Sequence, residues 1–234
     1  MPSCPPDSLT VEAVRFRSCR WSLTGSLAYA VDHAPVAAAL LAGPHPLLGG
    51  TMGNNVVRAL GDGLARLGLV TLRFDYRGVG MSEGPITDAS LSLAEFWQTS
   101  RTSEEGAFRE DVVAAATFLR QATARSLPLA LVGYSFGCSL LADLAPPTSA
   151  APRVLVAPTI GTHCYTAFSA VTAPKLVVAP RHDFASDEHR LEKWYEMLPE
   201  SKSLIRPDRD GHFFRGHEDW LAETVGSFLL EAFP

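Results

Sequence analysis

The chain lacks an excess of positive charge, a long apolar run and a secretory leader. Its 20 Lys and Arg residues are outnumbered by 25 Asp and Glu residues. The formal net charge of −5 argues against nucleic-acid binding, which needs a basic surface. No apolar run reaches the ~18 residues expected of a membrane-spanning helix. Residues 1–6 have neither the basic segment nor the apolar core of a signal peptide, so we expect a cytoplasmic protein without a membrane partner.

Cysteine is scarce as well. The chain has four cysteines, Cys4, Cys19, Cys138 and Cys164, and no two of them have CxxC spacing. Scattered cysteines are typical of reduced thiols in a cytoplasm, and not of zinc sites or disulfide frameworks. We therefore expect neither a metal nor another cofactor.

Apolar residues, in contrast, are plentiful enough for one substantial core. A length of 234 residues with 47% hydrophobic residues fits a single α/β domain. Residues 1–10 are rich in proline and polar residues and are expected to form a loose arm. Residues 11–234 would then make up the domain.

Short apolar runs alternate with amphipathic stretches along this domain. The runs at 36–42, 69–74, 128–132, 153–157, 175–179 and 203–206 are typical of buried strands. Residues 11–17 and 21–30 predict an antiparallel opening, with a turn at Thr24-Gly25 interrupting the second strand. Helices are expected at about 55–67, 104–121, 188–197 and 217–233. The alternation predicts a mostly parallel sheet with helices on both faces.

The most informative motif follows the apolar run at 128–132. Residues 133–137 read Gly-Tyr-Ser-Phe-Gly, and a small-residue segment of helical character comes next. A serine between two glycines at a strand-to-helix turn is typical of a nucleophile elbow. Gly133 and Gly137 would remove side chains that collide in so sharp a turn. Ser135 is therefore the candidate nucleophile, and a tight structural turn is the alternative.

A base and an acid follow in the required chain order. Asp183 lies in a loop just after the strand at 175–179, and His212 lies beside a glycine after the last strand. Histidine can accept the serine proton near neutral pH, and a buried aspartate orients the imidazole. Asp187, close to Asp183, is expected to cap the next helix. The order Ser…Asp…His is that of α/β-hydrolases.

The loop at 43–55 is placed to supply an oxyanion donor. Such a site needs two N–H groups, and the residue after the nucleophile, Phe136, would supply one. Pro44 and Pro46 have no N–H. We expect Leu47 to supply the second N–H, with His45 or Leu48 as the alternative. The His45 side chain is expected to be structural.

The stretch after residue 74 has a rival interpretation as a dinucleotide loop. It holds Gly78-x-Gly80 and a later Gly84. The third glycine is one place late, Pro85 follows instead of a helix, and no acidic residue closes a second strand about 20 residues on. A glycine turn tied down by Asp75 and Arg77 is the better interpretation.

Substrate pocket and lid are less clearly marked. Tyr134, Phe136, Tyr165, Phe184 and Phe213 are candidates for an apolar pocket, although aromatic residues at such places also pack in cores. The short segment at 158–174 argues against a large lid. Residues 86–103 fit either a flap or a surface helix. His163 and Cys164 are neighbours that point apart, so a Cys–His pair is not expected there.

Together these motifs resemble those of small bacterial α/β-hydrolases of the serine aminopeptidase and dienelactone-hydrolase-like group. The resemblance rests on residues 44–57, 74–84, 133–137 and 211–214 and covers most of the chain from about residue 36. The family usually has His-Pro-His-Pro in its loop, where this chain has Gly43 in place of the first histidine. Its Gly-x-x-Asp acid motif reads Pro180-x-x-Asp183 here. The resemblance implies hydrolysis of an ester, thioester or amide.

The expected protein is thus a single-domain α/β-hydrolase with a short lid or none. It would act on a small or medium carboxylic ester or thioester through an acyl-Ser135 intermediate. The alternatives are an acyltransferase or cyclase on the same triad and a non-catalytic binding protein with this fold. The sequence leaves the substrate and the oligomeric state open.

Overall fold

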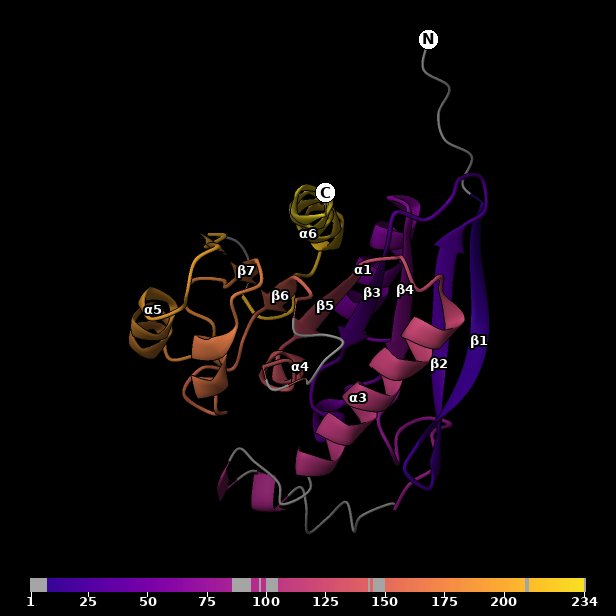
Figure 1. The fold of residues 1–234 in the computed structure, drawn as a ribbon. Coiled ribbons are helices and arrows are strands. Elements are labelled where there is room, and N and C mark those ends of the chain that lie inside the picture. The colour runs from indigo at the N-terminus through magenta and orange to yellow at the C-terminus, as the bar shows by residue number, and fades with distance from the viewer. Residues whose placement is uncertain are drawn as a thin grey trace.

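Eight strands of the computed structural model form one sheet with β5 near its middle (Figure 1). The structure describes residues 8–85, 94–96, 98–99, 105–142, 144, 150–208 and 211–233. The strand order is β1-β2-β4-β3-β5-β6-β7-β8. The strands are β1 (Leu9–Ser18), β2 (Trp21–Ala30), β3 (Ala37–Ala42), β4 (Leu69–Phe74), β5 (Leu129–Tyr134), β6 (Arg153–Val156), β7 (Lys175–Val178) and β8 (Lys202–Ile205).

The sheet is antiparallel only at the edge formed by β1 and β2. β1 pairs with β2 and β2 with β4 in antiparallel register, and the pairs from β4 through β8 are all parallel. The predicted strands and the mostly parallel arrangement are therefore confirmed. The expected turn at Thr24-Gly25 is wrong, because β2 runs through both residues. A Cβ on Gly25 would lie 3.0 Å from the Arg73 carbonyl oxygen, so this glycine allows β4 to approach closely.

Helices cover both faces of the sheet. The first face carries α1 (Asn55–Arg66) and α6 (Glu218–Ala232), and the second carries α3 (Glu105–Ala122), the short α4 (Phe136–Ser139) and α5 (Glu188–Glu196). Figure 1 shows α3 crossing in front of the sheet and α1 behind it. The predicted apolar stripe of α3 is buried in the second layer, as Phe108, Val112, Ala115, Ala116 and Leu119. The doubly covered sheet explains why its central strands are almost wholly apolar.

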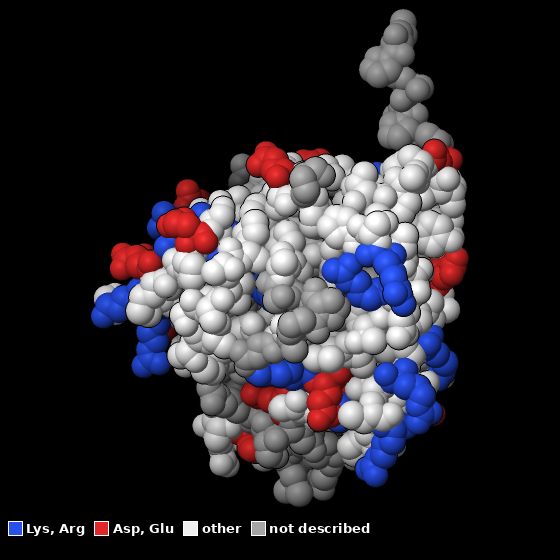
Figure 2. Space-filling view, viewed as in Figure 1, with Lys and Arg blue, Asp and Glu red and all other residues white. Residues whose placement is uncertain are grey.

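Some of the predicted segments lie at the ends of the described ranges or outside them. β1 begins at Leu9, inside the arm expected for residues 1–10. Residues 1–7, most of 86–103 and the Pro146-Pro147 stop lie outside the described residues. No helix in the described part of the chain is long and apolar enough to span a membrane. Figure 2 shows acidic and basic side chains interspersed on the face viewed.

Candidate active site

Ser135 lies in a sharp turn between β5 and α4. Its backbone angles, φ 56° and ψ −122°, lie in a region that residues with side chains rarely adopt. A Cβ on Gly133 would lie 2.6 Å from the Cα of Cys138, and one on Gly137 would lie 2.2 Å from the Ala42 carbonyl oxygen. Neither position has room for a side chain. The two glycines therefore make the turn possible, as the sequence predicts.

His212 joins Ser135 to Asp183 in one chain of contacts. The His212 Nε2 lies 2.9 Å from the Ser135 Oγ, and the His212 Nδ1 lies 3.0 and 2.9 Å from the two carboxylate oxygens of Asp183. All three residues are buried. A carboxylate facing Nδ1 holds the proton of a neutral imidazole there, so Nε2 can accept a proton from the serine. The structure thus brings together residues that follow β5, β7 and β8.

Asp183 and the nearby Asp187 have different surroundings. Asp183 accepts a hydrogen bond of 2.9 Å from the Ala185 N–H in addition to its contacts with His212. Asp187 is exposed and caps α5, where its Oδ1 accepts from the Arg190 N–H at 3.0 Å. The capping interpretation of Asp187 is therefore confirmed. Only Asp183 faces the histidine.

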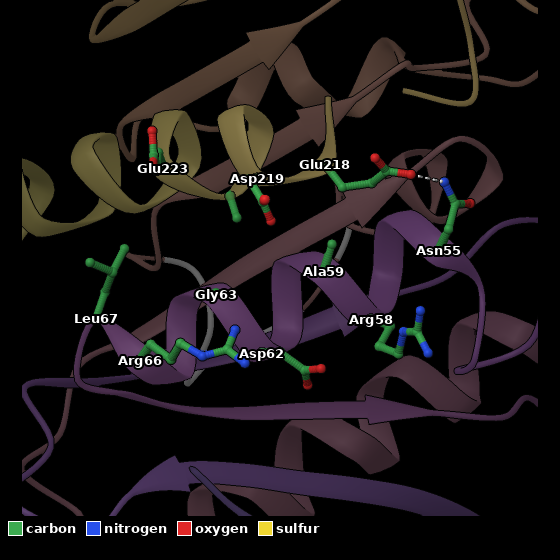
Figure 3. Close-up of a pocket in the computed structure, with 11 residues that line it drawn as sticks. Asn55, Arg58, Ala59, Asp62, Gly63, Arg66, Leu67, Glu218, Asp219 and Glu223 are labelled. Atoms are coloured by element: carbon green, nitrogen blue, oxygen red, sulfur yellow. Dashed lines mark hydrogen bonds between the residues drawn. The ribbon is translucent and has the colours of Figure 1, made fainter. Parts of the chain in front are cut away.

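The loop that carries His212 is held from two sides. The Tyr134 hydroxyl donates to the His212 carbonyl oxygen at 3.0 Å, and burial raises the pKa of Tyr134, which keeps the hydroxyl protonated. The Asn55 Nδ2 donates to the Phe213 carbonyl oxygen at 3.0 Å and to Glu218 at 2.9 Å. The bond from Asn55 lowers the pKa of Glu218. Asn55 therefore ties α1 to α6 through Glu218 (Figure 3) and both helices to the histidine loop through Phe213.

The predicted oxyanion loop needs a correction at Leu47. The Leu47 N–H donates to the His45 Nδ1 at 3.2 Å, and the Leu48 N–H donates to the His45 carbonyl oxygen at 3.0 Å. Both groups are engaged in the one-turn helix η1 (Pro46–Leu48), which the His45 side chain caps. The backbone N–H groups of His45 and Phe136 meet no acceptor in the described part of the chain. The vacant donor of this loop is thus His45, the alternative named above.

Ser135 and His212 line a cavity of about 440 Å³. Tyr134, Phe136, Phe184 and Phe213 also line it, as the sequence predicts. Phe184 is 75% exposed and Phe213 46% exposed, and their rings lie 5.0 and 5.5 Å from the His212 ring. These two aromatic residues form an apolar rim beside the histidine.

Tyr165 does not belong to this cavity, so its prediction as a pocket residue is wrong. Its ring packs in the core at 5.8 Å from Phe168 and 5.5 Å from Trp194. Its hydroxyl accepts from the Thr159 N–H at 2.9 Å and so holds the loop after β6. The residue is 4% exposed. Its aromatic ring serves packing, which a sequence pattern does not distinguish from substrate contact.

Several residues of the cavity, among them His163 and Phe96, were not predicted as pocket residues. His163 lines it, although its neighbour Cys164 is exposed and contacts the Thr166 Oγ1 at 3.1 Å. Phe96, from the segment expected to be a flap or surface helix, also lines the cavity. No local pattern around either residue marks it as a pocket residue.

The glycine turn after β4 is tied down by Asp75 and Arg77, as expected. The Met52 N–H donates to the Asp75 Oδ1 at 2.7 Å, and a Cβ on Gly80 would lie 2.4 Å from the Asp75 Oδ2. Burial raises the pKa of Asp75, and the bond from Met52 opposes that shift. Arg77 pairs with the fully buried Asp111 at 2.7 Å.

A second hollow lies between α1 and α6 (Figure 3). Charged side chains line it, among them Arg58, Asp62, Arg66, Asp219 and Glu223. It contains no serine, cysteine or histidine. No group of three His, Cys, Asp or Glu residues in the described part of the chain is arranged to hold a metal ion.

Several solved structures have a fold similar to that of this chain. A homologue of α/β serine hydrolases from Coxiella burnetii is 25% identical, with 93% of this chain and 97% of that chain covered and a TM-score of 0.76. A serine hydrolase without a lid from Xanthomonas campestris is 23% identical, with 96% and 95% covered and a TM-score of 0.79. A dienelactone hydrolase from Anabaena variabilis is 18% identical, with 97% and 99% covered and a TM-score of 0.73.

No protein-family model and no curated protein matches the sequence. The likeness therefore rests on the sheet, its two helical layers and the nearly complete coverage of each neighbour. These similarities show that the chain has the single-domain α/β-hydrolase fold.

Proposed function

We propose that this protein is a serine hydrolase that cleaves a small or medium carboxylic ester or thioester through an acyl-Ser135 intermediate. The observation that carries the proposal is the continuous contact from Ser135 through His212 to Asp183. A serine hydroxyl is a poor nucleophile at neutral pH unless a base stands beside it. The structural neighbours, described as serine hydrolases and esterases, support the same class of reaction.

The first half-reaction forms the acyl-enzyme. The Ser135 Oγ attacks the substrate carbonyl carbon while the His212 Nε2 takes the serine proton. The carbonyl oxygen becomes an oxyanion, which the backbone N–H groups of Phe136 and His45 stabilise. The bond to the leaving group then breaks, and His212 returns the proton to the departing alcohol or thiol. Asp183 stabilises the imidazolium while His212 carries the proton.

The second half-reaction releases the acid. His212 takes a proton from a water molecule, whose oxygen attacks the acyl carbon, and the bond to Ser135 breaks as its oxygen recovers the proton. The cavity of about 440 Å³ fits a small or medium substrate. The exposed Phe184 and Phe213 offer apolar contact to the leaving group beside His212.

Acyl transfer or cyclisation is the second candidate function, because an alcohol or amine can intercept the same intermediate. His212 lines the cavity beside the exposed Phe184, so a nucleophile that enters the cavity can reach it. Product analysis with and without an added alcohol distinguishes the two reactions.

Covalent labelling tests the proposal. A fluorophosphonate probe is expected to modify Ser135, with mass spectrometry of the digested protein locating the adduct. A panel of p-nitrophenyl esters of increasing chain length then gives the preferred acyl size from kcat/KM. An unlabelled, folded wild-type protein would favour the non-catalytic alternative.

A further inference from the structure

The cavity has two unlike walls on either side of Ser135. Phe184 and Phe213 lie beside His212, whereas His45 and His163 lie against the Phe136 ring, at 4.7 and 5.1 Å between centroids. His212 must protonate the leaving group, so under the proposed function the leaving group lies on the Phe184 wall. The acyl group then lies against the wall of His45 and His163.

Both histidines of the acyl wall carry an unpaired buried atom. The Nε2 atoms of His45 and His163 are buried without a hydrogen-bond partner in the described part of the chain. Their side chains are 3% and 6% exposed. Buried polar atoms are nearly always paired, because an unpaired one costs about 1–3 kcal/mol. Two such atoms in one cavity wall therefore indicate a polar group of a ligand.

The hydrogen bonds at the Nδ1 atoms of these two histidines determine whether each Nε2 atom is a donor or an acceptor. The Leu47 N–H donates to the His45 Nδ1 at 3.2 Å, so a neutral His45 ring carries its proton on Nε2. The Tyr165 oxygen accepts from the Thr159 N–H at 2.9 Å, and the Thr159 Oγ1, 3.1 Å away, is the acceptor within reach of the Tyr165 hydroxyl proton. The Thr159 hydroxyl then donates to the His163 Nδ1 at 2.9 Å. Both neutral rings therefore present an Nε2–H donor.

A carboxylate lies close to both donors. Glu105, where α3 begins, has its Oε1 3.7 Å from the His45 Nε2 and 3.4 Å from the His163 Nε2. Both separations exceed those of normal N–H···O bonds. The negative charge opposes an anionic substituent at this place. A hydroxyl group suits the arrangement, because its oxygen accepts from an imidazole N–H while its proton faces the carboxylate.

We propose that this wall selects an acyl group that carries a hydroxyl, so that the substrates are esters or thioesters of hydroxy acids. The inference rests on the proposed function, because it uses Ser135 to define the acyl side. His163 is its specificity-determining residue. A substrate hydroxyl would give these donors a hydrogen bond of normal length, which Glu105 does not give them, whereas an unsubstituted chain would leave them buried without one.

The test compares p-nitrophenyl butyrate with the 2-hydroxy and 3-hydroxybutyrate esters. In the wild type, kcat/KM for the better hydroxy ester is expected to exceed that for butyrate by about tenfold or more, from one unpaired buried donor. His163→Phe keeps an aromatic ring beside Phe136 and removes one of the two donors, so this ratio should fall severalfold. His163→Gln keeps an N–H donor and should retain part of the ratio. His189→Phe, at an exposed histidine of α5, is the matched control and should leave it unchanged.

Fluorophosphonate labelling of Ser135 in every variant separates the two proposals. Labelled wild type with a ratio near one overturns the hydroxyl subsite and leaves the proposed function standing. A high ratio that His163→Phe does not change, in a variant that still labels, also overturns the subsite. Loss of labelling in the folded wild type overturns the proposed function. If His163→Phe does not fold, the proposal is judged on the wild-type ratio and on the ratio in His163→Gln, and a wild-type ratio near one overturns it.

Discussion

Two buried aspartates in this protein have similar geometry and different partners. Asp183 is 7% exposed and contacts the His212 Nδ1 with both oxygens, at 3.0 and 2.9 Å. Asp111 is 0% exposed and accepts from the Arg77 side chain at 2.7 and 3.0 Å and from the Arg77 backbone N–H at 3.0 Å. One carboxylate orients an imidazole beside the candidate nucleophile. The other anchors the loop that follows β4.

The partner decides what each carboxylate can do. Histidine gains and loses a proton near neutral pH, so the Asp183 pair is suited to proton transfer. Arginine stays charged, and although burial alone lowers the pKa of Arg77, its hydrogen bonds and charge contacts with Asp111 and Glu110 outweigh this and raise it. The Asp111 pair is therefore suited to holding structure. We expect substitutions at the two aspartates to separate turnover from stability.

Ser135→Ala is expected to have the largest effect, a loss of about a million-fold in kcat, because no nucleophile remains. The fold should persist, because alanine keeps the Cβ atom of serine and loses only the hydroxyl group. Ester hydrolysis and fluorophosphonate labelling measure the loss, and thermal unfolding reports the fold. Turnover retained at wild-type levels would contradict the acyl-enzyme mechanism.

Asp183→Asn is expected to lower kcat by about ten-thousandfold, because an amide facing Nδ1 favours the wrong imidazole tautomer. Steady-state kinetics on a p-nitrophenyl ester measure the change. Asp187→Asn is the matched control: Asp187 caps α5 and does not contact His212, so its kcat should stay close to wild type. A large loss of kcat in Asp187→Asn with little loss in Asp183→Asn would assign the acid role to Asp187 instead.

Asp111→Ala is expected to lower the free energy of unfolding by about 3–5 kcal/mol, because it leaves the Arg77 guanidinium buried without its main partner. Urea unfolding followed by circular dichroism measures the difference. Glu110→Ala is the control on the same helix. Its side chain is 56% exposed, so it should cost less than about 1 kcal/mol. Equal costs for the two variants would contradict a structural role specific to Asp111.

Asn55→Ala is expected to have the smallest effect on turnover, a decrease in kcat of about threefold to tenfold. It removes the hydrogen bond to the Phe213 carbonyl oxygen, worth about 0.5–1.5 kcal/mol, and so loosens the loop that positions His212. A lower kcat with little change in KM would indicate positioning. Arg58→Ala, on the same helix and in the hollow of Figure 3, should leave kcat unchanged.

The sequence was sufficient to predict the turn around Ser135, the two residues expected to pair with it, and the cap of α5. The role of Gly133 and Gly137 could be predicted because a strained turn needs glycine where another backbone segment leaves no room for a Cβ atom. Asp183 and His212 could be chosen because parallel strands bring the loops at their carboxyl ends to one edge of the sheet. The helix-capping role of Asp187 followed from its place before α5.

Other parts of the site escaped sequence reasoning for a physical reason. Leu47 has an N–H as Phe136 does, but the fold of η1 turns that N–H to the His45 ring. Tyr165 and Phe184 are both aromatic residues in loops, yet one is buried in the core and the other is 75% exposed. Whether an N–H or a ring is free depends on the folded conformation, both where the partner is two residues away, as for Leu47, and where it comes from another element, as for Tyr165 and Trp194.

The sequence by itself determined the class of fold, the elbow at Ser135 and the order of its partners, because periodicity, glycine and chain order are local or cumulative properties. The tertiary structure alone placed the His163 Nε2 in the cavity wall without a hydrogen-bond partner in the described part of the chain. It also brought Glu105 between His45 and His163, although these residues come from three separate segments of the chain. Contacts of that kind arise from the packing of whole elements, which no single stretch of sequence specifies.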